Sequence, residues 1–153
     1  MTTVAHAAET FTIADTILVR ASIEKTFASL LVQMGRQNTS GNNVPMPMVI
    51  EPFPGGRWYR ELGGDNGHLW GFVQSIKRPT LLEIWGPLMI STGATSNLMY
   101  RLSEVEGGTQ IAFTHTLFGP LPDGYRNNLS IGWNALHTRV REAAEADGGD
   151  LLA

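Results

Sequence analysis

The chain has 153 residues, no cysteine and a formal net charge of −3, from 11 Lys and Arg against 14 Asp and Glu residues. This length favours one domain, and the lack of cysteine excludes disulfides, thiolate zinc sites and thiol catalysis. A mildly acidic chain without basic runs is a poor candidate for nucleic-acid binding, and no apolar run approaches the length that inserts into a membrane.

The N-terminal third of the chain predicts one strand, one helix and a long loop. Residues 1–10 show neither a basic start nor an apolar run, so we expect a flexible tail, no secretory signal and a cytoplasmic location. Partial alternation of apolar residues predicts a strand over 11–20. Ser22 can cap a helix over 22–34, in which apolar residues recur at helical spacing, and the polar, glycine-rich stretch 35–45 predicts a loop.

The middle of the chain consists of short, regularly spaced strands separated by turn residues. Such strands are predicted at 48–51, 57–62, 67–76, 80–86, 95–103 and 109–117. Because the connections between them are short, the strands should form an antiparallel meander. Beyond the last strand, Asp123 can cap a helix that runs to about 146 with a regular apolar stripe, and 147–153 is expected to be a C-terminal tail.

The order of these elements predicts a single α+β domain over 11–146. Each of the two helices carries an apolar face, and the sheet offers the only large apolar surface for them to cover. We therefore expect both helices on one face of an antiparallel sheet, with a pocket between the sheet and the last helix. Charged residues make up only 16% of the chain, which also favours a large interior or an internal cavity.

Several segments of the chain follow the order and spacing of a known superfamily. They are the opening strand and helix at 17–27, the Gly55-Gly56 hairpin, 71–73 leading to 79–85, Tyr100-Arg101-Leu102, 108–111 with Thr114-His115, and Gly132-Trp133 in the last helix. Over about residues 11–145 the chain resembles the SRPBCC or START-like superfamily, and within it the AHSA1-like branch related to the activator of Hsp90 ATPase.

The resemblance implies a helix-grip (START/Bet v 1-like) fold, in which a curved seven-stranded antiparallel sheet wraps around a long C-terminal helix. It also implies a hydrophobic cavity between the sheet and that helix, because members of the superfamily bind lipids, sterols, polyketides or hormones, or act as cyclases. The polar loop at 35–43 departs from the many family members that have an apolar, Trp-rich segment after the first helix.

The expected cavity is rich in aromatic rings and has a few hydrogen-bonding groups. The candidate ligand-binding residues are Arg57, Tyr59, His68, Trp70, Trp85, Tyr100, Phe113, Trp133 and His137. Trp133 lies at the centre of the apolar stripe on the last helix, where core packing alone would also explain it. Both faces of the strand at 67–76 are rather apolar, so the pattern does not decide which face looks inward, and Gly71 marks a candidate bulge.

Three titratable residues are candidates for acid–base catalysis, namely His115, Glu83 and Glu51. His115 shares its strand face with apolar neighbours, so it is either a hydrogen-bonded core histidine or a group that orients a ligand or transfers a proton. Leu81 and Trp85 flank Glu83 at a period of two, which makes Glu83 the first candidate among the strand carboxylates for an inward orientation. An inward Arg57 would hold a carboxylate-bearing ligand by a bidentate contact, although charged strand residues more often face solvent.

Three hypotheses of function follow from these residues. The favoured one is binding of a small hydrophobic or amphipathic molecule in the cavity between the sheet and the C-terminal helix. The first alternative is an enzyme of the cyclase, isomerase or lyase type that uses the His or Glu residues in the same cavity. The second is a protein-interaction domain of co-chaperone type, and a homodimer is a further expectation. No cofactor or metal is expected, because the histidines lack short-range ligand spacing and no glycine loop precedes a helix in a βαβ unit.

Overall fold

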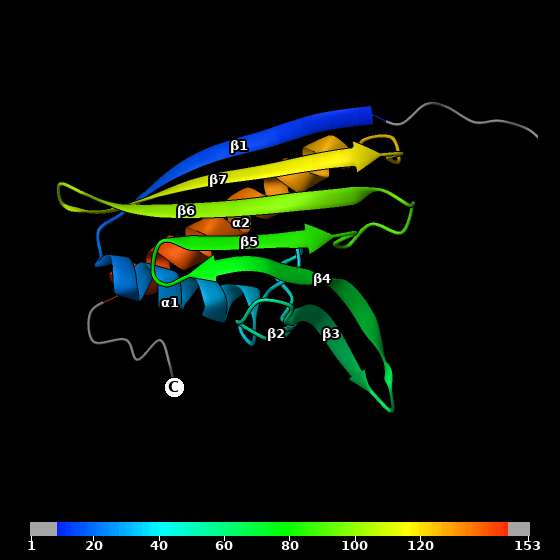
Figure 1. The fold of residues 1–153 in the computed structure, drawn as a ribbon, viewed down its shortest axis with the longest axis horizontal. Helices are drawn as coiled ribbons and strands as arrows, with labels where there is room; N and C mark the ends of the chain where they lie inside the picture. The colour runs from blue at the N-terminus through cyan, green and yellow to red at the C-terminus, as the bar shows by residue number, and fades with distance from the viewer. Residues whose placement is uncertain (1–8, 147–153) are drawn as a thin grey trace, which may run out of the picture.

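The computed structural model describes residues 9–146, which form one sheet with two helices on one of its faces (Figure 1). The elements in chain order are β1 (Glu9–Val19), α1 (Ile23–Met34), β2 (Val49–Ile50), β3 (Arg57–Gly63), β4 (Asn66–Lys77), β5 (Leu81–Gly86), β6 (Thr95–Val105), β7 (Gly108–Gly119) and α2 (Tyr125–Glu145). The predicted seven-stranded antiparallel sheet and long C-terminal helix are therefore confirmed. The tails expected at the two ends fall mostly on 1–8 and 147–153, which lie outside the described residues. No helix within 9–146 is long and apolar enough to cross a membrane.

The sheet places its first strand, β1, beside its last strand, β7. Its strand order is β1-β7-β6-β5-β4-β3-β2, and each neighbouring pair is antiparallel. β1 pairs with β7 along its whole length, with Ile17 opposite Ile111. β1 forms one edge of the sheet, and the short strand β2 forms the other. Both helices cover the same face of the sheet, called the inner face here, and pack against each other (Figure 1). At their contact the Ser29 hydroxyl donates a hydrogen bond to the Val140 carbonyl at 2.8 Å.

The core forms where the inner face of the central strands meets α2. Alternation along β6 and β7 turns every second residue inward, and these buried residues are Ser96, Leu98, Tyr100, Leu102, Ile111, Phe113, His115 and Leu117. The stripe of α2 that packs on them consists of Leu129, Trp133, Leu136, His137, Val140 and Ala144. Two histidines and a tyrosine are thus buried among hydrocarbon side chains, where each polar atom needs a partner.

The starts of the two helices differ in how well the sequence predicts them. Ser22 caps α1 as expected, because its hydroxyl accepts a hydrogen bond from the Lys25 backbone N–H at 3.2 Å. The cap predicted at Asp123 is wrong. Gly124 takes that place in a left-handed conformation, with φ of 77°, and no side chain caps the helix.

Two bulges in β4 reset the alternation of its side chains. Trp58 lies opposite Gly71 and Tyr59 opposite Leu69, so Trp70 is an extra residue, and a second shift follows between Val73 and Ser75. Trp70 and Val73 are consequently both buried although their spacing is odd. Beyond the bulges the hairpin of β3 and β4 extends away from the rest of the sheet, and residues 61–69 are exposed (Figure 1).

Candidate functional site

A cavity of about 330 Å³ lies between the N-terminal half of α2, the loop after α1, and the bulged part of the sheet. From α2 it is lined by Tyr125, Asn128, Leu129, Gly132, Trp133, Ala135, Leu136 and Arg139, and from the rest of the chain by 38–41, Met46, Trp58, Trp70 and Met89. The α2 residues recur mostly at spacings of three and four, so they form one face of the helix. This volume is at the lower end of the range of small-molecule sites.

Gly132 opens the middle of the helical wall. A Cβ atom built at this position would have no other atom within 4 Å. Glycine in a helix interior costs about 1 kcal/mol relative to alanine, so the helix itself gains nothing from it. The residue instead leaves space on the side of α2 that faces the cavity.

Three tryptophans give the cavity apolar walls. The indole N–H of Trp58 donates to the Met34 carbonyl at 2.9 Å, that of Trp70 to His68 Nδ1 at 3.1 Å, and that of Trp133 to His115 Nδ1 at 3.0 Å. An indole has a single donor and no acceptor, so each ring has no free polar atom left for a bound molecule. The rings of Trp58 and Trp70 also meet edge to face, with centroids 5.0 Å apart.

His115 is held as a neutral imidazole of one defined tautomer. Because the indole of Trp133 can only donate, Nδ1 of His115 accepts, and its proton is on Nε2, which donates to the Ser96 hydroxyl at 2.7 Å. Burial lowers the pKa of His115 to about 4. Since Nε2 already carries its proton, the imidazole cannot accept one from Ser96. His115 therefore cannot act as a general base that activates the Ser96 hydroxyl as a nucleophile.

A second chain of hydrogen bonds joins the buried Tyr100 and His137 to the partly exposed Asp15. The Asp15 carboxylate accepts from His137 Nδ1 at 3.1 Å, so His137 Nε2 accepts from the Tyr100 hydroxyl at 3.0 Å. Burial lowers the pKa of His137, and the hydrogen bond and charge of Asp15 oppose part of that effect. Burial raises the pKa of Tyr100 well above its usual range, and the Asp15 charge adds to the rise.

Aromatic rings pack around the two histidines of these chains, and neither histidine lines the cavity, although His137 and the partly exposed Asp15 line a separate surface hollow. Phe113 lies 4.5 Å from His137, 4.8 Å from Tyr100 and 5.2 Å from Trp133, measured between ring centroids. Trp133 alone belongs both to this cluster and to the cavity wall, which contains neither histidine. The structure therefore brings Tyr100 and Phe113 of the sheet together with Trp133 and His137 of α2 in the core, but it separates most of them from the cavity.

The two candidate glutamates lie away from the cavity. Leu82 and Ile84 are the buried residues of β5, so Glu83 points to the outer face, where Ser75 donates to it at 2.8 Å and Asn97 at 2.7 Å. The predicted inward orientation of Glu83 is wrong, because its flanking residue Trp85 is itself an outer-face side chain, 46% exposed.

Glu51 forms an ion pair with Arg57 at 2.8 Å near the β2–β3 turn. The hydrogen bond from the Arg57 side chain lowers the pKa of Glu51, yet both groups are in contact with solvent. Arg57 also lies over the Tyr59 ring, 4.5 Å from its centroid, and His68 is exposed on the projecting hairpin. Of the nine predicted ligand-binding residues, Arg57, Tyr59, His68 and Trp85 are thus placed outside the cavity, and Trp70 and Trp133 line it.

Arg139 is a cavity residue that the sequence analysis missed. Its Nη2 donates to the Thr39 carbonyl at 3.3 Å, which ties α2 to the loop at the cavity mouth. Its Nε is the one buried side-chain nitrogen or oxygen within residues 9–146 that has no hydrogen-bond partner. Burial lowers the pKa of Arg139. A signal was present in the sequence, because Arg139 lies three residues after Leu136 and seven after Gly132, on the face that continues the apolar stripe.

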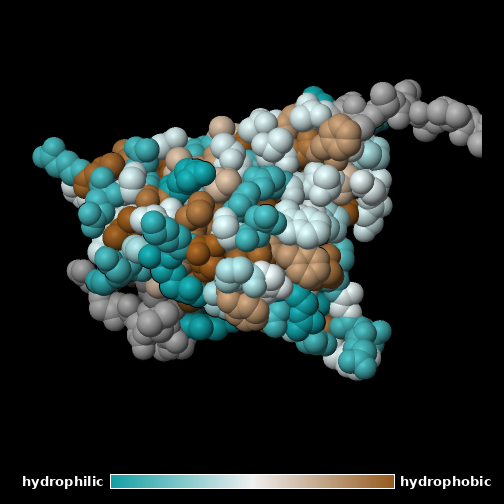
Figure 2. Space-filling model, viewed as in Figure 1, coloured by the Kyte–Doolittle hydropathy of each residue, from teal (hydrophilic) through white to brown (hydrophobic). Residues whose placement is uncertain are grey.

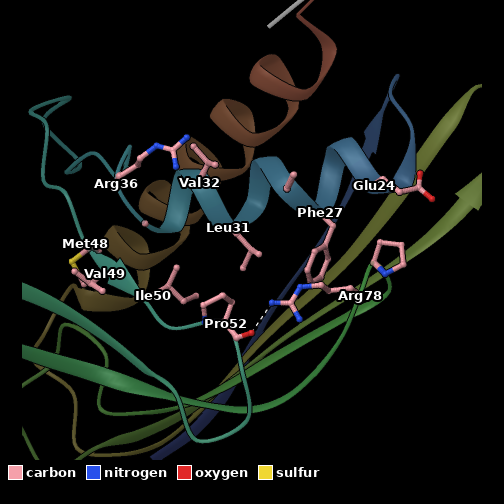
Figure 3. Close-up of a pocket in the computed structure, with 13 residues that line it drawn as sticks. Glu24, Phe27, Leu31, Val32, Arg36, Met48, Val49, Ile50, Pro52 and Arg78 are labelled. Carbon is pink, nitrogen blue, oxygen red and sulfur yellow. Dashed lines mark hydrogen bonds between the residues drawn. The ribbon is translucent and has the colours of Figure 1, made fainter. Parts of the chain in front are cut away.

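A larger groove of about 690 Å³ separates α1 from the segment around β2 and from the β4–β5 turn. Figure 3 shows Phe27, Leu31 and Ile50 directed into this space, with Arg78 donating to the Pro52 carbonyl at its floor. The groove is more open than the cavity and contains no tryptophan or histidine. The two hollows share no lining residue, so they are separate sites.

The side chains of the described residues do not form a metal site. No group of three or more His, Asp or Glu residues within 9–146 is arranged to hold a metal ion. The outer face of the sheet carries a mixture of hydrophilic and hydrophobic residues (Figure 2), so the hydropathy of this face does not mark one region as a binding surface.

Comparison with known proteins shows a shared fold. No family model matches the chain, and no curated protein matches it by sequence. The Aha1 dimer from Colwellia psychrerythraea is similar with a TM-score of 0.67 and 17% identity, covering 91% of this chain and 99% of that one. Ara h 8.0201 is similar with a TM-score of 0.62 and 15% identity over 88% of this chain and 96% of that one.

The di-domain ARO/CYC BexL from the BE-7585A biosynthetic pathway is similar with a TM-score of 0.63 and 16% identity. The match covers 90% of this chain and 50% of BexL. At such identities the likeness shows the fold alone. The chain therefore has the helix-grip fold that its resemblance to the SRPBCC superfamily implied.

Proposed function

We propose that the chain binds a small hydrophobic or amphipathic molecule in the cavity between α2 and the sheet. The observation that carries the proposal is that Gly132 leaves space at the wall of a cavity that three indole rings also line, and the N–H groups of these rings all have protein partners. Such a wall favours apolar surface, and a few polar groups at the mouth would fix the orientation of the ligand. Ara h 8.0201 and the ARO/CYC protein BexL share the fold, which is compatible with a role in holding a small molecule.

The acid–base alternative has less support. His115 and His137 are paired with other side chains in the core, and Glu51 and Glu83 lie outside the cavity. A reacting molecule in the cavity would be out of hydrogen-bond reach of these groups in their present positions. The co-chaperone-like alternative and the homodimer remain proposals, for which the dimeric Colwellia structure is an example of the fold in an assembled state.

The proposal is tested by filling the cavity. We expect 1-octanol, titrated by isothermal calorimetry, to bind the wild-type protein and to lose at least about tenfold in affinity to the Gly132→Leu variant, whose new side chain occupies the hollow. Asn134→Leu is the matched control, because Asn134 is an exposed position on the same helix. Equal affinity of the wild type and Gly132→Leu, or loss in both variants, would contradict the assignment of the site.

A further inference from the structure

The cavity wall contains a cation that pairs with no acidic side chain of residues 9–146. Arg139 is one of the lining residues, and none of the others is an Asp or Glu. No ion pair involves Arg139 within the described range, and its hydrogen bond to the Thr39 carbonyl is the only one it makes there. The charge is therefore present at an apolar cavity without a counter-charge from the part of the chain that the structure describes.

The guanidinium is also under-used as a hydrogen-bond donor. It has five N–H donors, of which one reaches a carbonyl, and Nε is buried without a partner. Leaving a buried donor unsatisfied is unfavourable, more so when the group is charged. An acceptor brought in by a bound molecule would remove that deficit.

We propose that the molecule held in this cavity carries a carboxylate, which pairs with the Arg139 guanidinium while its apolar part lies against the indole rings. This inference rests on the proposed function, since it names the class of ligand for the same cavity. It moves to Arg139 the anchoring role that the sequence analysis gave to Arg57, whose guanidinium is occupied by Glu51.

The chemistry of the Arg139 guanidinium and of the indole rings favours this class of ligand. The planar fork of a guanidinium matches a carboxylate in a bidentate geometry, whereas an alcohol offers one acceptor atom and an ammonium offers none. The indoles of Trp58, Trp70 and Trp133 offer apolar ring faces only, because their N–H groups are used elsewhere. A volume of 330 Å³ corresponds to roughly ten waters of liquid, so the tail is short.

The test compares three probes with one eight-carbon tail: octanoate, 1-octanol and octylamine. At pH 7 octanoate is ionised, and we expect it to bind the wild-type protein more tightly than either of the other two. In a ¹H–¹⁵N spectrum, octanoate should shift the Arg139 Nε–H resonance, whereas 1-octanol should leave it nearly unchanged. This comparison needs no variant, so it stands even if a substitution at Arg139 impairs folding.

Variants then separate recognition of charge from support of the cavity. Arg139→Met should weaken octanoate binding roughly tenfold or more and change 1-octanol binding by less than about threefold. Arg139→Lys keeps the charge but lacks the planar fork, so its loss for octanoate should be intermediate. Arg141→Met is the matched control, because Arg141 is on the same helix and does not line the cavity.

The possible results distinguish this inference from the proposed function. If 1-octanol binds in a manner that Gly132→Leu blocks, and octanoate binds no better, the cavity proposal stands and the carboxylate inference is overturned. If Arg139→Met weakens both probes equally, Arg139 only supports the loop through Thr39, and the inference is again overturned. If no probe binds the wild-type protein, both proposals fail together.

Discussion

His115 lies between an indole that can only donate and a hydroxyl that can accept, and this pair of neighbours fixes the proton on Nε2. A second proton would have to go on Nδ1, where it would meet the Trp133 N–H. Burial adds to this cost, so the imidazole stays neutral well below the pH at which an exposed histidine ionises. The residue therefore acts as a polar link between β6, β7 and α2.

This arrangement predicts that acid destabilises the fold in a defined window. The pKa of His115 is about 4 in the folded state against 6.5 ordinarily, so the unfolded chain takes up its proton first as the pH falls. Its contribution is fully present above pH 6.5 and is lost towards pH 4, by roughly 3 kcal/mol in the free energy of unfolding. Urea unfolding at several pH values measures this loss.

His115→Gln serves as the comparison variant for the acid window, since glutamine offers a neutral donor and acceptor. We expect its stability to depend less on pH between 6.5 and 4 than that of the wild type. Parallel curves for His115→Gln and the wild type would show that His115 is not the group responsible.

The sequence showed that His115 is buried, but not with whom it pairs. Its neighbours Ile111, Phe113 and Leu117 on alternate positions indicated the inner face. Its partners Ser96 and Trp133 are 19 and 18 residues away along the chain, and their approach depends on how α2 lies across the sheet. Pattern analysis contains no information at that range, so both chemical roles of the histidine stayed open.

Among the elements, β4 and β5 show where pattern analysis reaches its limit. Strict alternation holds in β6 and β7, and their inner residues could be predicted. In β4 two bulges reset the alternation, and in β5 apolar residues occupy both faces, which led to the wrong side for Glu83. A hydrophobic residue on an outer face, such as Trp85, whose ring centroid lies 5.4 Å from that of Phe72, looks the same in sequence as a core residue.

Replacing a glycine by alanine should have opposite effects on the free energy of unfolding at two positions, one in α2 and one in β4. Gly132→Ala should raise the free energy of unfolding by about 1 kcal/mol, because helix propensity improves and the new Cβ meets no other atom. Gly71→Ala should lower it by about 1–3 kcal/mol, because a Cβ in β4 would lie 2.7 Å from the Trp85 carbonyl oxygen. Denaturant unfolding of the pair checks both values, and a stabilising Gly71→Ala would contradict the close strand contact at the bulge.

At the scale of the whole molecule, the order of elements was enough to predict an α+β domain with both helices on one face of an antiparallel sheet, and the resemblance to a known superfamily added the helix-grip arrangement. Seven strands joined by short turns form a meander, and α2 has only the inner face of that sheet to cover. The size and position of the cavity were not predictable in the same way. They depend on where large rings such as Phe113 and Trp133 fill the space and where Gly132 leaves it open.

The central claim is that a small apolar molecule enters between α2 and the sheet. The four indole N–H resonances in a ¹H–¹⁵N spectrum test it directly, because Trp58, Trp70 and Trp133 line the cavity and Trp85 lies on the outer face. Titration with 1-octanol should shift the first three resonances along one saturable curve and leave that of Trp85 in place. Unchanged resonances for the three cavity tryptophans, or a saturable shift confined to Trp85, would contradict it.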